Sequence, residues 1–173
     1  MKRIKLLSVF LFSVCALVFT SCSDDDSSGG TACITLVDQP VQGSFRGDAF
    51  VSPAGFFKIL TFGSETTYRG EIYVKEDIDD DCFFPFFDGT QDNILFPLPS
   101  LEPQTITLSD TGVNTLNFNR IVNGVTEVEL AECGTITITS YDEANGILEG
   151  TVVARGQEGS TVNGNFTLLL CEF

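Results

Sequence analysis

The segment GTITITSYDEANGILEGTVVARGQEGSTVNGNF, residues 134–166, decides the fold. It begins with a strict alternation of Thr and Ile, which is the period-two pattern of a half-buried strand. Two turn signals, Asn145-Gly146 and residues 156–160, divide the remainder into two further short runs rich in apolar residues. Because short turns join neighbouring antiparallel strands, this segment predicts an antiparallel meander.

Similar short runs of Thr, Val, Ile and Phe, separated by Gly, Asn and Asp, fill most of the chain, and no stretch has a convincing helical period. We therefore expect an all-β domain, either an antiparallel β-sandwich or an open barrel-like sheet, of about 8–10 strands. The predicted strands are residues 42–51, 56–62, 67–75, 105–109, 115–121, 125–131, 134–140, 147–155 and 161–172.

The N-terminus has the pattern of a secretory signal peptide. Three basic residues precede the run LLSVFLFSVCALVFT, residues 6–20, which is shorter than the about 20 apolar residues of a membrane span. The end of this run and the two residues after it, Phe19-Thr20-Ser21-Cys22, resemble the lipobox of bacterial lipoproteins, and this resemblance implies that Cys22 is acylated and becomes the new N-terminus. The alternative is ordinary signal-peptide cleavage that leaves Cys22 as a thiol.

The residues after Cys22 read SDDDSSGG. Ser23-Asp24-Asp25-Asp26 resembles the export signal of Bacteroidota-type surface lipoproteins, which implies a position on the outer face of the outer membrane. A generic acidic tether is the alternative. We expect three parts: a signal peptide (1–21), an acidic Ser/Gly tether (22–31) that reaches at most about 30 Å, and one β-sandwich domain (32–173).

The charge of the chain excludes one class of partner. Three of the nine basic residues leave with the signal peptide, so six remain against 24 acidic residues, a net charge of 6 − 24 = −18. Nucleic acids and anionic lipids are bound through Lys and Arg that neutralise phosphates. We therefore expect no nucleic-acid partner, and membrane attachment only through the lipid anchor.

Four cysteines remain after the signal peptide and Cys22 are set aside: Cys33, Cys82, Cys133 and Cys171. In an exported domain an even number predicts disulfides, here two. In the meander Cys133 begins one strand and Cys171 ends the strand two along, so they lie roughly 20–30 Å apart, which disfavours Cys133–Cys171 and with it the complementary pair Cys33–Cys82.

Two pairings remain. We prefer Cys33–Cys171 with Cys82–Cys133, because it fixes the last strand beside the first. The other is Cys33–Cys133 with Cys82–Cys171.

The stretch KEDIDDDCFFPFFDG, residues 75–89, is the candidate for chemistry. Its spacing from Asp77 to Asp88 resembles an EF-hand calcium loop, but Cys82 replaces the turn Gly and no helices flank it. We predict a solvated acidic loop and no metal or cofactor. The adjacent Phe83, Phe84, Phe86 and Phe87 either cover the core or form an apolar patch that binds a partner or an apolar ligand.

Catalysis has little support in the sequence. The chain has no His, which excludes Ser-His-Asp and Cys-His arrangements, and no Gly-rich phosphate loop opens a helix. A carboxylate pair could hydrolyse glycosides, but nothing singles out one pair among 24 acidic residues. We predict that the protein is not an enzyme.

A second resemblance concerns residues 134–166. Their Gly-initiated Thr/Ile strand, the Tyr141-Asp142 turn, the strand Leu148-Glu149-Gly150-Thr151 and the final Gly164-Asn165-Phe166 are similar to the closing strands of small Bacteroidota lipoproteins of a domain-of-unknown-function family. This resemblance implies a β-sandwich at the cell surface and no known activity.

We therefore expect a lipid-anchored outer-membrane lipoprotein, exposed at the cell surface, that acts as a non-catalytic binding or envelope-associated module. The alternative is a surface lipoprotein that binds a glycan or an apolar ligand for uptake. A carboxylate-dependent hydrolase is the third and least supported hypothesis.

Overall fold

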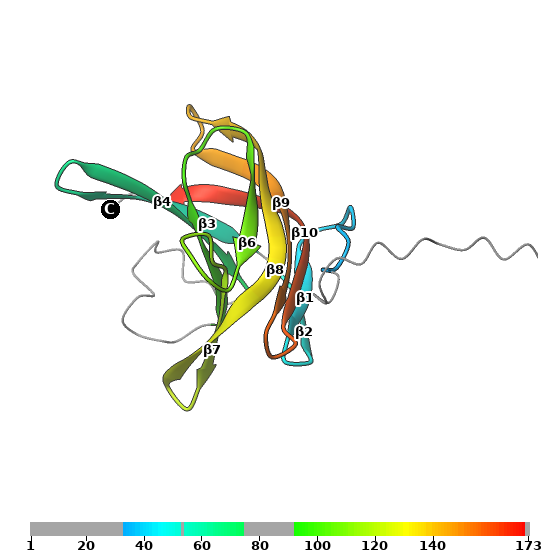
Figure 1. Ribbon diagram of the computed structural model, residues 1–173. Helices are drawn as coiled ribbons and strands as arrows, with labels where there is room; N and C mark the ends of the chain where they lie inside the picture. The colour runs from blue at the N-terminus through cyan, green and yellow to red at the C-terminus, as the bar shows by residue number, and fades with distance from the viewer. Residues whose placement is uncertain (1–32, 53, 75–91, 172–173) are drawn as a thin grey trace, which may run out of the picture. The chain divides into compact units, whose positions relative to one another are not determined.

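The computed structural model describes residues 33–52, 54–74 and 92–171 (Figure 1). These residues form ten strands, and none of them forms a helix with the length and apolar character that a membrane crossing requires. The strands are β1 (Gln42–Phe45), β2 (Asp48–Val51), β3 (Gly55–Phe62), β4 (Glu65–Tyr73), β5 (Asn93–Leu98), β6 (Gln104–Ser109), β7 (Asn117–Val122), β8 (Val125–Asp142), β9 (Ile147–Gly156) and β10 (Thr161–Cys171).

The strands pair in a circuit that returns to its starting point. From β3 the pairing passes through β4, β5, β7, β8 and β9 to β10, and every one of these pairs is antiparallel. The end of β10 then pairs with the start of β3 in parallel, with Leu169 opposite Phe56. The fold is therefore an all-β, predominantly antiparallel, barrel-like sheet, as the sequence predicts.

Two long strands, β8 and β10, each pair with more than two other strands (Figure 1). One edge of β8 pairs first with β7 and then, beyond a bulge between Ala131 and Cys133, with β6, while β9 runs along its other edge. Strand β10 pairs with β9 on one edge, and on the other edge with β1 near Thr161 and with β3 near Leu169. The meander predicted for β8, β9 and β10 is confirmed.

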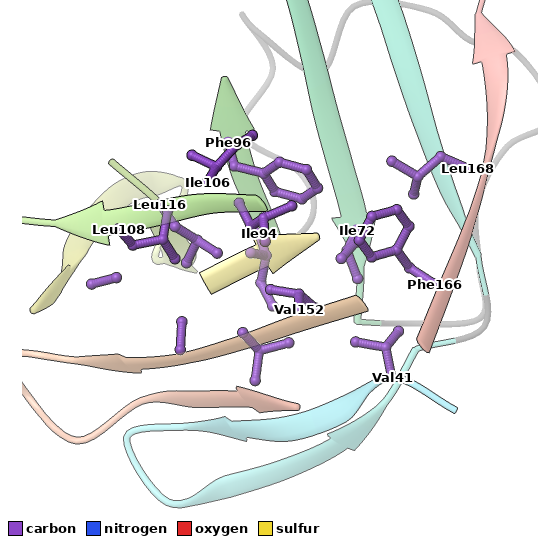
Figure 2. Packing of buried hydrophobic residues seen from close by; sticks show 14 of the residues in the cluster. Val41, Ile72, Ile94, Phe96, Ile106, Leu108, Leu116, Val152, Phe166 and Leu168 are labelled. Carbon is purple, nitrogen blue, oxygen red and sulfur yellow. The ribbon is translucent and has the colours of Figure 1, made fainter. Parts of the chain in front are cut away.

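One hydrophobic cluster fills the space between the strands (Figure 2). The alternation of the Thr/Ile strand places Ile136 and Ile138 in this cluster, at 0% and 1% exposure. Two glycines make room for aromatic rings. A Cβ on Gly150 would lie 2.5 Å from Phe166 Cζ, and one on Gly70 would lie 2.4 Å from Phe96 Cε2. The rings of Phe96 and Phe166 consequently approach to 6.0 Å between centroids.

Apart from shifts of one or two residues at strand ends, the structure differs from the predicted strands in three ways. Residues 42–51 form the hairpin β1–β2 because Arg46 and Gly47 both adopt positive φ and reverse the chain. The predicted strands 125–131 and 134–140 are one strand, β8, with a bulge where two were expected. Strand β5 was not predicted. It contains Pro97, which lies in the part of β5 that pairs with β4 alone, where a missing donor is tolerated.

Candidate functional site

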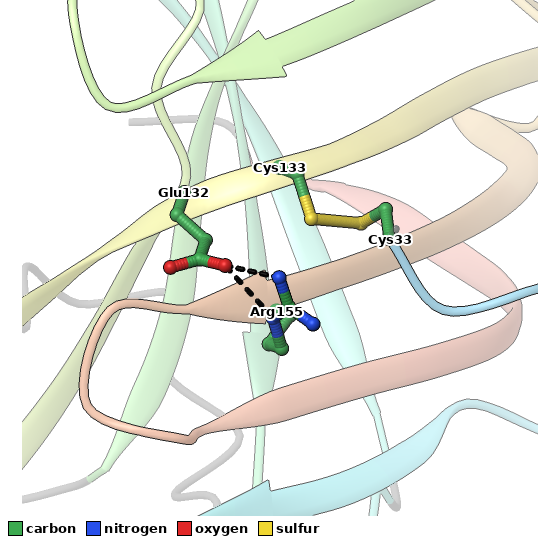
Figure 3. The surroundings of a disulfide bond; sticks show 4 residues. All are labelled: Cys33, Glu132, Cys133 and Arg155. Carbon is green, nitrogen blue, oxygen red and sulfur yellow. Dashed lines mark hydrogen bonds and ion pairs between the residues drawn. A yellow bond between two sulfur atoms is a disulfide. The ribbon is translucent and has the colours of Figure 1, made fainter. Parts of the chain in front are cut away.

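Residues 33–41, which we call the strap, run from β8 to β10 before the chain enters β1, and the last three of them pair with the edge of β10 beside Asn165. The strap starts at a disulfide between Cys33 and Cys133, whose Cα atoms are 5.8 Å apart (Figure 3). Cys133 lies in β8 directly after the bulge, opposite Arg155 of β9. The first described residue of the chain is therefore bonded covalently to the longest strand of the sheet.

Two asparagines of β10 hold the rest of the strap. The Asn163 side chain accepts a hydrogen bond from the Val37 backbone N–H (2.8 Å) and donates to the Thr35 carbonyl (2.7 Å), so it binds the strap as a neighbouring strand would. Asn165 donates from its side chain to Asp38 (2.7 Å) and from its backbone to the Gln39 carbonyl (2.7 Å).

Gly164, between these asparagines, permits the close approach of the strap. Its φ of +134° and the Gln39 carbonyl oxygen, 2.6 Å from where a Cβ would stand, both exclude a side chain.

The disulfide corrects the preferred pairing of the sequence analysis. Cys33–Cys171 with Cys82–Cys133 is wrong, because Cys33 is bonded to Cys133. The physical reason is that the strap runs past β10 before β1 begins, which carries Cys33 across the sheet to β8. Cys133 is not paired with Cys171, as the separation of these residues along the meander predicts. Cys171 is buried at the end of β10, opposite Lys58 of β3.

An ion pair flanks the disulfide (Figure 3). Arg155 Nε donates to Glu132 Oε1 at 2.9 Å, and its Nη2 donates to the same oxygen. Both side chains are partly exposed, so the pair adds at most about 1 kcal/mol to stability. The Glu132 carboxylate balances the charge of Arg155, which lies opposite Cys133.

A hydroxyl-rich face lies on the outer side of β6, β8 and β9. In register across these strands, Thr105 is opposite Thr137 and Thr137 is opposite Thr151, while Thr107 is opposite Thr135. We call these five threonines the hydroxyl face. All five are exposed or half-buried, because the residues between them, such as Ile106 and Ile136, turn into the core. The hydroxyls of Thr105 and Thr137 are 3.2 Å apart and share a hydrogen bond.

A buried polar cluster lies on β3 and β4. Lys58 and Glu71 are each 1% exposed and form an ion pair with 3.0 Å between Nζ and Oε2. The Tyr73 hydroxyl donates to the same oxygen at 3.0 Å, and Arg69 lies 3.5 Å from the other oxygen of Glu71. Desolvation by burial lowers the pKa of Arg69, and the coulombic interaction with Glu71 opposes this shift. The ion pair of Lys58 and Glu71 joins β3 to β4, and we assign this cluster a structural role.

A second buried carboxylate, Glu129 of β8, binds the turn between β9 and β10 and lies 3.8 Å from Arg46 Nε of the turn between β1 and β2. Its Oε1 accepts hydrogen bonds from the backbone N–H groups of Glu158 (2.6 Å) and Ser160 (3.1 Å), and its Oε2 accepts from the Ser160 hydroxyl at 2.5 Å. Gly156 makes room for this carboxylate, since a Cβ there would stand 2.1 Å from Oε1. On the outer side of the same turn Arg46 bonds Glu127 at 2.7 Å and Glu158 at 2.6 Å.

Two small hollows and one larger, shallow hollow open near these elements. One, of about 140 Å³, lies where β10 separates from β1 and β3, and Val41, Ile72, Phe166 and Leu168 are among its lining residues. The other, of about 200 Å³, lies beside the ion pair of Asp48 and Arg120. Both are smaller than the about 300–1,000 Å³ of ligand pockets. A third hollow, of about 440 Å³, lies over the β1–β2 hairpin, is shallow and open to solvent, and has Gln42, Ser44, Phe50 and Thr161 among its lining residues. No group of three His, Cys, Asp or Glu residues in the described ranges is placed to hold a metal ion.

Several predicted site residues lie outside the described residues. These are the lipidation residue Cys22, Cys82, the aromatic patch of Phe83, Phe84, Phe86 and Phe87, and the acidic loop from Asp77 to Asp88.

Sequence reasoning missed the strap, the hydroxyl face and Glu129. The alternation of Thr105-Ile106-Thr107 and of residues 135–139 could have indicated the hydroxyl face, whereas nothing local marks Glu129 among 24 acidic residues. No family model, no curated protein and no solved structure matches this chain.

Proposed function

We propose that the protein is a lipid-anchored lipoprotein of the outer membrane, exposed at the cell surface, where it acts as a non-catalytic binding or envelope-associated module. The sequence supports the anchor through the lipobox-like Phe19-Thr20-Ser21-Cys22 and the Ser-Asp-Asp-Asp run that follows it. The disulfide at the start of the strap also supports the proposal. Cys33, eleven residues after Cys22, is bonded to the longest strand, β8, so a tether that starts at Cys22 would join the domain at a covalent bond.

The anchor is tested by metabolic labelling of cells with an alkyne-bearing fatty acid. The full-length protein should incorporate the label, and Cys22→Ser should abolish incorporation while Cys15→Ser leaves it unchanged. Protease treatment of intact cells should then degrade the wild-type protein if it lies outside. Replacing Asp24, Asp25 and Asp26 together by Ser should protect the labelled protein from the protease. Equal labelling of the wild type and Cys22→Ser would refute the anchor.

A second function, glycan binding by the same anchored module, is favoured by the hydroxyl face. Five hydroxyls form two neighbouring rows on a sheet face with no charged residue among them, in a chain whose formal net charge is −15. The spacing is about 4.8 Å across strands and about 6.7 Å along them, and both hydrogen-bond donors and acceptors are present. A neutral, hydroxyl-bearing polymer matches this surface, whereas an anionic polymer would be repelled by the rest of the molecule.

Co-sedimentation of the full-length protein in detergent with insoluble cellulose or chitin tests this function. Thr137→Glu places a charge in the centre of the face and should reduce the bound fraction at least tenfold. Thr66→Glu, at the exposed tip of the β3–β4 hairpin, adds the same charge elsewhere and serves as the control. Equal effects of the two variants, or no binding by the wild type, would exclude the hydroxyl face as a glycan site.

A further inference from the structure

The strap is attached to the sheet in two ways that differ in how they resist a pull on the tether. Along residues 35–41 the attachment is a series of hydrogen bonds to Asn163 and Asn165. Each such bond adds little net stability, and a pull from the N-terminal side would open them one at a time. At Cys33 the attachment is a single covalent bond that precedes all of them in the chain.

The disulfide directs a pull into a part of the sheet with partners on both sides. Cys133 is opposite Ser109 of β6 on one edge of β8 and opposite Arg155 of β9 on the other. Cys133 lies at the end of the β6–β8 ladder and beside the bulge of the β8–β9 ladder, so a pull on it is resisted by both ladders, of six and ten residue pairs. By contrast, β1 pairs with β10 over only three residue pairs.

We propose that the Cys33–Cys133 disulfide is the mechanical mount of the domain: tension from the membrane anchor passes through Cys33 into β8 and bypasses the strap and β1. This role rests on the proposed function, because only an N-terminal anchor creates tension at this end. The strap itself is held in place by Asn163 and Asn165 but carries no tension while the disulfide is closed.

Optical tweezers test the load path on the full chain in detergent, with one handle at a tag inserted between Ser27 and Ser28 and the other at the C-terminus. The oxidised wild type should show no extension before the sheet unfolds. The double variant Cys33→Ser/Cys133→Ser should show an early, low-force release of residues 33–40. Eight extended residues span at most roughly 25–30 Å, and the gain in extension is this length minus the distance that the strap already spans in the fold. If the variant does not fold, the variant Cys82→Ser/Cys171→Ser, measured before and after reduction by dithiothreitol, gives the comparison, because reduction then opens Cys33–Cys133 without breaking the predicted Cys82–Cys171 bond.

Asn165→Ala provides the matched control. In the oxidised chain it should leave the force–extension curve unchanged, because the hydrogen bonds of Asn165 lie behind the disulfide. In the double-serine background it should lower the force of the early release.

Early release in the oxidised wild type, or no early release in the double-serine variant, overturns the load path. Failure of Cys22 to take up the fatty-acid label overturns the proposed anchor and with it the mounting role. Because labelling and force measurement are separate experiments, a failure of the anchor is distinguished from a failure of the load path.

Discussion

Glu129→Ala should be among the most destabilising single substitutions in the domain. The change removes the acceptor for the backbone N–H and the hydroxyl of Ser160, a residue with 0% exposure, so water cannot replace the lost partner. Each buried donor left without an acceptor costs about 1–3 kcal/mol, which gives about 4 kcal/mol for the two. The third donor, the N–H of Glu158, belongs to an exposed residue, and we assign it no cost.

The corresponding fall in melting temperature is about 10–15 °C for a domain of 173 − 31 = 142 residues. Differential scanning calorimetry of the full-length protein in detergent measures it. Glu127→Ala is the matched control, because it removes a carboxylate of the same strand that is 41% exposed and bonds Arg46 at 2.7 Å. Its expected cost is about 0–1 kcal/mol. Equal costs for the two variants would refute the reasoning that burial and donor satisfaction give Glu129 its importance.

Three further predictions concern other parts of the fold. Hydrogen bonds from the Asn145 side chain and backbone lower the pKa of Asp142. The ionised carboxyl therefore contributes stability above its unfolded pKa, and this stability is lost as pH falls through its folded pKa. Asn145→Ala should raise the Asp142 pKa toward its ordinary value in an NMR titration. With Cys33 and Cys133 bonded to each other, the prediction of two disulfides leaves Cys82–Cys171, so peptide mapping without reduction should find this linked pair, and alkylation of Cys171 in the unreduced protein would contradict it. Gly134→Ala should destabilise the domain by about 2–4 kcal/mol in a denaturant titration, because φ is +149° and the new Cβ would lie 2.2 Å from a carbonyl oxygen of β9; an unchanged midpoint would contradict this.

The all-β class and the closing meander were predictable because their signals are local. Alternation in residues 135–139 and the Asn145-Gly146 turn each act within a few residues, and the structure follows both. The missed strand β5 shows the limit of that logic. Pro97 argues against a strand by local rules, but the pairing of β7 ends at Leu95, so no partner on that edge needs a donor from Pro97.

The path of the strap and the circuit of strands had no local signal. The pairing of β3 with β10 joins residues more than 100 positions apart, and the strap depends on two asparagines whose alternation resembles that of any exposed strand. The Cys33–Cys133 pairing was one of two that survived elimination, and only the course of residues 33–41 distinguishes them. Glu129 could not be identified because its burial arises from the turn between β9 and β10, about 30 residues later in the chain.

The dependence of β1 and β3 on β10 also sets the order in which the chain can fold. Gln42 pairs with Asn163, a separation of 163 − 42 = 121 residues, and Phe56 pairs with Leu169, a separation of 169 − 56 = 113. Neither N-terminal strand can complete its pairing until the last strand has been made. Contacts at such separations slow folding to the millisecond-to-second range. A chain that threads through a secretion channel with its N-terminus leading would therefore remain open throughout translocation and close its sheet only after the final strand has crossed.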